Sequence, residues 1–145
     1  MTVRTWFTIS ALCVIALFGA VALKLTAPVN APTMLARVGE IRLQGMRVAS
    51  CWPNGEKTKC EGRGSSASAV TVPRRGTLRI VVAYPLQPTS RQGYIAIRSG
   101  RNVVLRRDWH ENTRYDLAPG TYEAVAYARY RSNAHIEYSF PFRVA

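Results

Sequence analysis

The chain has 145 residues, 48% of them hydrophobic, and a formal net charge of +12 at pH 7. This apolar content excludes a purely disordered tail, and the length suits one domain with a core of ordinary size. The charge bears on partners and solubility rather than on fold. Arginine dominates the basic residues, because the only lysines are Lys24, Lys57 and Lys59.

The first element is an apolar run of 19 residues without charge, Thr5 to Leu23. As a helix it would reach roughly 28 Å, close to the thickness of a hydrocarbon core. Arg4 and the amino terminus favour a cytoplasmic N-terminus. We therefore expect a signal anchor over 1–25, which would make this a single-pass inner-membrane protein with a periplasmic domain.

A cleaved signal peptide is the alternative for the same run. Ala20-Val21-Ala22 offers an A-x-A site, and cleavage after Ala22 would release a secreted or periplasmic protein. If the run is retained, small and hydroxyl side chains could pack against other membrane helices. These candidate packing residues are Ser10, Gly19, Ala20 and Ala22.

A Pro/Ala-rich segment, 26–37, follows the run and predicts a short extended tether. We expect one domain after it, over 38–145. Cys51 and Cys60 are separated there by eight residues with a turn expected at Gly55-Glu56, which predicts a disulfide across a hairpin. Two free thiols are the alternative, and a zinc site is disfavoured because no histidine pair matches the spacing.

The rest of the chain has the two-residue periodicity of strands and no helical period. In the last strand Ile136 and Phe140 share one face, and Pro141 predicts an edge position. In the strand before it Val125 and Tyr127 lie opposite an alanine face, which predicts an apolar pair outside the core. The expected strands begin with short segments around Ile41–Leu43 and Met46–Val48 and continue with Thr77–Tyr84, Gly93–Arg98, Asn102–Arg107, Thr121–Arg131 and His135–Val144.

About seven short strands joined by turns predict an all-β, antiparallel sandwich. Leu117-Ala118-Pro119-Gly120-Thr121-Tyr122 resembles the turn and penultimate strand of immunoglobulin-like and fibronectin type III domains. The resemblance implies that Tyr122 is a corner tyrosine and that Trp109 or Trp52 packs in the core. Cys51 and Cys60 are too close in sequence to bridge two sheets as the cysteines of antibody domains do.

Signatures of catalysis are weak. Gly62-Arg63-Gly64 lacks the third glycine and the strand-to-helix setting of a dinucleotide loop. Asp108, His110 and Glu111 could form a metal or acid/base cluster, but a solvated connecting loop over 108–112 is the better interpretation. We therefore expect a protein that is not an enzyme and has no catalytic, metal-binding or cofactor-binding residues.

The arginines of the second half carry the only functional signal. They predict a surface for anionic partners, such as lipid headgroups or an envelope polymer, whereas nucleic acid is not expected outside the cytoplasm. Dispersed solubilising charges are the alternative. The predicted surface comprises Arg98, Arg101, Arg106, Arg107, Arg129 and Arg131.

Two functional hypotheses follow from these features. The first is an accessory or scaffolding subunit, whose helix packs in a larger membrane complex and whose basic sandwich docks on the periplasmic side. The second is a secreted binding module for an anionic polymer or an adhesive target.

Overall fold

The computed structural model describes residues 30–54, 56–85, 87–130 and 134–145. Within these ranges no helix is long and apolar enough to cross a membrane. The run Thr5–Leu23, its candidate packing residues Ser10, Gly19, Ala20 and Ala22, and Arg131 lie outside the described residues.

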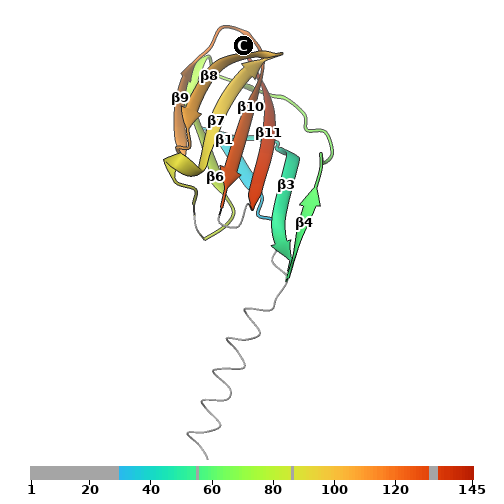
Figure 1. Ribbon diagram of the computed structural model, residues 1–145. Coiled ribbons are helices and arrows are strands. Elements are labelled where there is room, and N and C mark those ends of the chain that lie inside the picture. The colour runs from blue at the N-terminus through green and yellow to red at the C-terminus, as the bar shows by residue number, and fades with distance from the viewer. Residues whose placement is uncertain (1–29, 55, 86, 131–133) are drawn as a thin grey trace, which may run out of the picture.

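The described part is all-β, as predicted, and forms two sheets that pack as a sandwich (Figure 1). The smaller sheet has the order β2 (Ile41–Leu43), β1 (Met34–Val38), β6 (Arg75–Val82) and β9 (Asn112–Asp116). The larger sheet has the order β4 (Lys57–Glu61), β3 (Met46–Asn54), β11 (His135–Val144), β10 (Gly120–Arg129), β7 (Gly93–Ser99) and β8 (Asn102–Asp108). The short β5 (Val70–Val72) pairs with β11 in parallel, and a 3₁₀ turn spans Ser90–Gln92. All other pairings are antiparallel.

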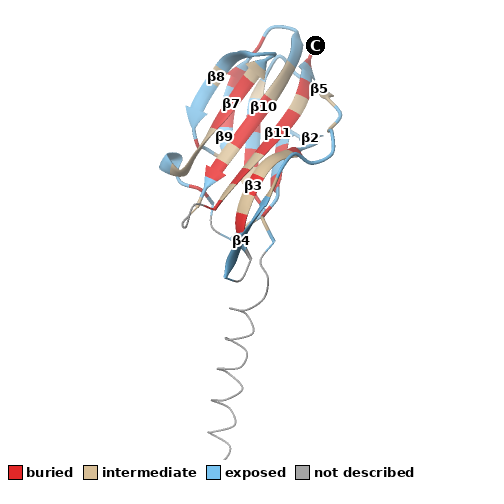
Figure 2. Ribbon diagram, turned by 45° about the vertical axis from the view of Figure 1, so that its right-hand side comes forward, coloured by how far each residue is buried: buried red, intermediate tan, exposed pale blue. Residues whose placement is uncertain are grey.

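The core lies between the two sheets and follows from alternation along each strand, which points successive side chains to opposite faces (Figure 2). The alanines of β10 face the core, as the sequence predicts, and lie beside large apolar side chains of β11. Trp52 and Trp109 are both buried in the same cluster. Side chains with no measurable exposure are Ile80, Ile95, Ile97, Ala124, Ala126, Ala128, Ile136 and Phe140.

The hairpin of β3 and β4 places Cys51 directly opposite Cys60, and the two are joined by a disulfide. The spacing of the cysteines therefore predicted this contact correctly. Trp52, the next residue in β3, makes edge-on contacts with Tyr84 and Tyr130 at ring-centroid distances of 5.4 and 5.3 Å. This aromatic trio attaches the hairpin to the body of the sandwich.

Three strands escaped the sequence analysis. β1 lies within the segment assigned to the tether, because Pro28 and Pro32 dominate its composition although residues 34–38 alternate regularly. β9 begins at Asn112, inside the expected 108–112 connection, and it is short and polar on its outer face. β5 is the third, and with only three residues it presents too little alternation to detect.

Two expectations about the last hairpin were wrong. β11 is not an edge strand, because it lies between β3 and β10. Its pairing with β3 ends at Ser139 and its pairing with β5 begins at Phe142, so Pro141 occupies the gap between two partners on that side.

Val125 is not an exposed apolar residue, since only 2% of its surface is accessible. Its cross-strand neighbours Ala96 and Ser139 are also buried. The loop after β4 lies over one end of this row, where Ala67 lines a groove with Met46 and Ser139. Burial of side chains on the outer face of the sheet cannot be recognised from strand periodicity.

Two close approaches fix backbone positions in the larger sheet. The Tyr122 hydroxyl donates a hydrogen bond of 2.8 Å to the Ala118 carbonyl, the local contact made by a corner tyrosine. Gly93, at the start of β7, lies so near the Tyr127 carbonyl oxygen that a Cβ there would overlap it.

Candidate anion-binding site

The outer face of the smaller sheet is built by two strongly alternating strands. In β1, Met34, Ala36 and Val38 are buried, and the residues between them, Leu35 and Arg37, are exposed. β6 has the same pattern, with Leu78, Ile80 and Val82 buried in alternation with outward side chains. The hydrophobic requirement of the core therefore fixes which side chains stand outside.

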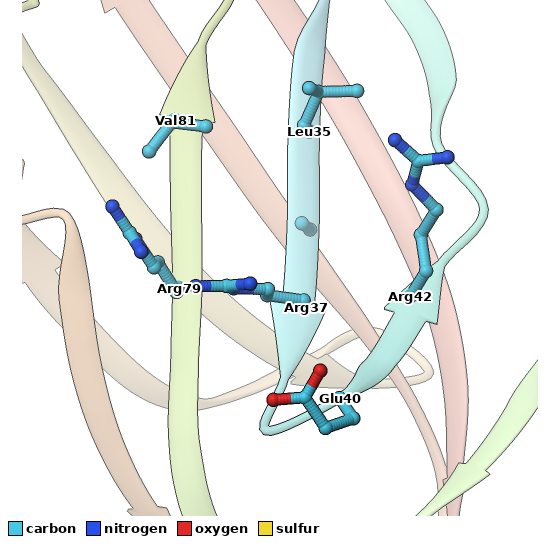
Figure 3. A pocket seen from close by; sticks show the side chains of 7 residues that line it. Leu35, Arg37, Glu40, Arg42, Arg79 and Val81 are labelled. Atoms are coloured by element: carbon cyan, nitrogen blue, oxygen red, sulfur yellow. The ribbon is translucent and has the colours of Figure 1, made fainter.

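The register of the smaller sheet aligns three arginines in one cross-strand row. Arg37 in β1 is opposite Arg42 in β2 on one side and opposite Arg79 in β6 on the other. Adjacent strands lie roughly 4.8 Å apart, so the main-chain positions of the three arginines lie within about 10 Å of one another. We call Arg37, Arg42 and Arg79 the arginine row (Figure 3).

The charge of the arginine row is only partly compensated. Arg79 pairs with Glu111, its Nη2 and Nε atoms lying 2.5 and 2.6 Å from Oε1. Arg37 and Arg42 make no ion pair with any described residue. Glu40 lines the same groove and makes no ion pair with a described residue either. Two guanidinium groups are thus available to an external anion.

A groove of about 380 Å³ runs over the arginine row. The outward side chains of the row project above the sheet, and the backbone around Ala36 contributes to the lining. Leu35 and Val81 are cross-strand partners and line the same groove beside the arginines (Figure 3). Leu35 is 43% exposed. The groove therefore has one basic and one apolar part.

Guanidinium groups in this arrangement are suited to phosphate and carboxylate. Each is planar, remains charged at any physiological pH and carries five N–H donors, so it can bind two oxygens of one anion at once. Like charges in directly opposed positions of a sheet are otherwise unfavourable. A bound anion between the arginines would turn this repulsion into attraction.

The arginine surface predicted from sequence is divided among several positions. Arg98, Arg106 and Arg129 lie on the outer face of the larger sheet, since the residues beside them in β7 and β10 alternate into the core. Arg107 is opposite the buried Ile95 and so projects from the other face of β8. Arg101 lies in the turn between β7 and β8.

Part of this outer face is already occupied by contacts within the chain. The guanidinium of Arg106 lies 4.2 Å from the centre of the Tyr94 ring, which stacks on Tyr127. Tyr94 is thus in contact with Arg106 and with Tyr127 within the chain. Arg98 is half-buried. These arginines are less available than Arg37 and Arg42.

Two of the polar side chains in the loop between β8 and β9 are engaged by other groups of the chain. His110 Nδ1 lies 2.8 Å from the carbonyl oxygen of Asn112, within its own turn, and Glu111 is engaged by Arg79. In the described ranges no three His, Cys, Asp or Glu side chains come together in a way that could hold a metal ion.

Shifted pKa values also lie away from the arginine row. Lys59 and Arg47 lower the pKa of Glu61 beside the β3–β4 hairpin, chiefly through a hydrogen bond from Lys59. Burial raises the pKa of Tyr130 to about 12, with a contribution from Tyr84. These shifts reflect packing and surface ion pairs.

The arginine row was missed by the sequence analysis because β1 was assigned to the tether. The alternation Met34-Leu35-Ala36-Arg37-Val38 is the signal that would have identified the strand. The row itself depends on the pairing of Arg37 with Arg79, 42 positions later in the chain. No local pattern reveals such a register.

Neither the family models nor the curated proteins nor the solved structures give a match to this chain.

Proposed function

We propose that this chain is a membrane-anchored docking subunit without enzymatic activity, whose immunoglobulin-like sandwich binds anionic groups through the arginine row. The observation that carries the proposal is that Arg37 and Arg42, which are opposite each other in β1 and β2, have no ion-pair partner among the described residues. A fixed array of cations favours acidic partners and speeds their association.

Strand order supports the immunoglobulin-like assignment. β1, β6 and β9 form one sheet, and β8, β7, β10 and β11 are consecutive in the other. In chain order, the first, second and fifth of these seven strands form one sheet and the others form the second sheet. This division is similar to that of immunoglobulin-type sandwiches, in which a corner tyrosine lies near the start of the penultimate strand. β2 to β5 are then an insertion between the first two strands of the pattern.

The expected location rests on the sequence and agrees with the disulfide. Thr5–Leu23 has the length and composition of a signal anchor, with the N-terminus in the cytoplasm and the sandwich in the periplasm. A structural disulfide such as Cys51–Cys60 is typical of proteins outside the cytoplasm. The proposed partners are subunits of an integral membrane complex and anionic envelope components, and nucleic acid is not among them.

The experiment is native mass spectrometry of the full-length chain purified in mild detergent with its associated subunits. We expect an intact N-terminal run and a defined partner in the wild type, with partner occupancy reduced at least tenfold in R37Q/R42Q. The control R101Q/R107Q removes the same charge from exposed positions on the β7–β8 hairpin. A monomeric wild-type protein, or equal losses in both variants, would contradict the proposal.

The alternative is a secreted module for an anionic polymer, which the same basic groove also favours. The mature N-terminus separates the two functions. A protein that begins at Leu23 supports the secreted module, and one that retains Met1 supports the anchored subunit.

A further inference from the structure

The groove over the arginine row combines charge with an apolar side, and this combination indicates the kind of anion that fits it. We infer that the groove binds an anionic phospholipid, with the phosphate on Arg37 and Arg42 and the first methylenes beside Leu35 and Val81. The inference rests on the proposed function and specifies the ligand of its anion-binding surface.

The phosphate position follows from the unpaired donors. Arg37 and Arg42 are cross-strand neighbours and lack an acidic partner among the described residues, whereas Arg79 is held by Glu111. Arg37 extends toward Arg79 and Arg42 extends toward the level of Leu35 (Figure 3), and when these exposed side chains turn toward each other one phosphate can accept hydrogen bonds from both guanidinium groups. It would remove the repulsion between them without displacing an existing ion pair.

The apolar position follows from the register. Leu35 precedes Arg37 by two residues on the same face of β1, and Val81 follows Arg79 by two on the same face of β6. Two residues of a strand span roughly 7 Å, about the separation between a headgroup phosphate and the beginning of its acyl chains. A sugar polymer with only charges and hydroxyl groups would leave Leu35 without a partner.

Size and position favour a lipid over an acidic protein face. The volume of about 380 Å³ lies in the range of small-molecule sites, whereas a protein partner usually covers about 800 Å² of each surface. Leu35 also lies on the side of the arginine row from which the chain arrives. Only ten residues, 25–34, separate Lys24 from Leu35, so the reach between these two residues is at most about 40 Å.

The experiment measures lipid retention by the full-length protein in detergent, again by native mass spectrometry. The probes are phosphatidylglycerol, phosphatidylcholine and glycerol 3-phosphate, added at equal concentration. We expect phosphatidylglycerol to bind at least tenfold more tightly than phosphatidylcholine, because only the former carries a net negative charge. We also expect it to exceed glycerol 3-phosphate by at least tenfold, because the apolar part contributes.

Two variants and one control locate the bound lipid. R37Q/R42Q should lose at least tenfold in phosphatidylglycerol affinity, and R101Q/R107Q should retain it. Leu35→Gln should weaken phosphatidylglycerol severalfold and leave glycerol 3-phosphate unchanged. Far-UV circular dichroism confirms that each variant is folded.

Three results would overturn the inference. They are equal binding of phosphatidylglycerol and glycerol 3-phosphate, equal binding of the two lipids, and retention of phosphatidylglycerol by R37Q/R42Q. If lipid binding fails while R37Q/R42Q still loses its protein partner, the proposed function stands and the lipid assignment is wrong. If the lipid binds and no protein partner is found, the lipid assignment stands and the proposed docking function is wrong.

Discussion

Replacing Arg37 with glutamine should stabilise the fold while it weakens anion binding. Arg37 stands between Arg42 and Arg79 in directly opposed positions. A like-charged cross-strand pair is unfavourable by roughly 0.2–1 kcal/mol. The repulsion between Arg37 and Arg42 contributes fully to this cost. The repulsion between Arg37 and Arg79 contributes less, because Glu111 forms an ion pair with Arg79. We therefore expect R37Q to gain about 0.5–1 kcal/mol.

Urea unfolding at two salt concentrations tests this expectation. The Debye length is about 30 Å at 0.01 M and about 3 Å at 1 M, so the gain should be present at low salt and vanish at high salt. R101Q is the matched control, since it removes one charge from a turn outside the row. A destabilised R37Q, a gain that persists at 1 M salt, or an equal gain in R101Q would refute the reasoning.

Three further predictions concern the sandwich. Replacing Cys51 and Cys60 with alanine should lower the free energy of unfolding by roughly 2–3 kcal/mol, the loop-closure entropy of so short a loop, and reduced wild type should behave alike in urea. Gly93→Ala must displace main chain in the larger sheet, so we expect a loss above about 2 kcal/mol by thermal unfolding, whereas Gly62→Ala meets open space and should be neutral. Burial raises the pKa of Tyr130 to about 12, above its ordinary value near 10. Its contribution to stability is therefore complete below pH 10 and lost as pH rises through 12. In Tyr130→Phe the highest step of an absorbance titration should disappear, and its persistence would contradict the shift.

Local features of the fold were predictable and distant pairings were not. The Cys51–Cys60 hairpin follows from cysteine spacing within ten residues, and the pairing of β10 with β11 follows from alternation around one turn. The central position of β11 could not be predicted from a local pattern, because it depends on pairing with β3, which precedes β11 by more than 80 residues. The sequence indicated that Pro141 lies in a strand. It could not indicate that β3 and β5 both pair with the same side of β11.

The candidate site was less predictable than the fold. Arginines that are close in sequence led to the prediction of a basic surface that includes residues 98–107. The structure aligns Arg37, Arg42 and Arg79 instead, from three strands of which one was missed. A cluster made by register has no counterpart in linear spacing, so only the paired strands reveal it.

The edges of both sheets have a consequence for the colloidal behaviour of the protein. β4 ends the larger sheet with Lys57 and Lys59 exposed, and β8 ends it on the other side with Arg106 and Arg107 exposed. β2, at one edge of the smaller sheet, is only three residues long. Short or charged edges oppose strand addition by a second molecule. The sandwich can thus expose an apolar, basic groove to solvent without nucleating fibrils through its open strands.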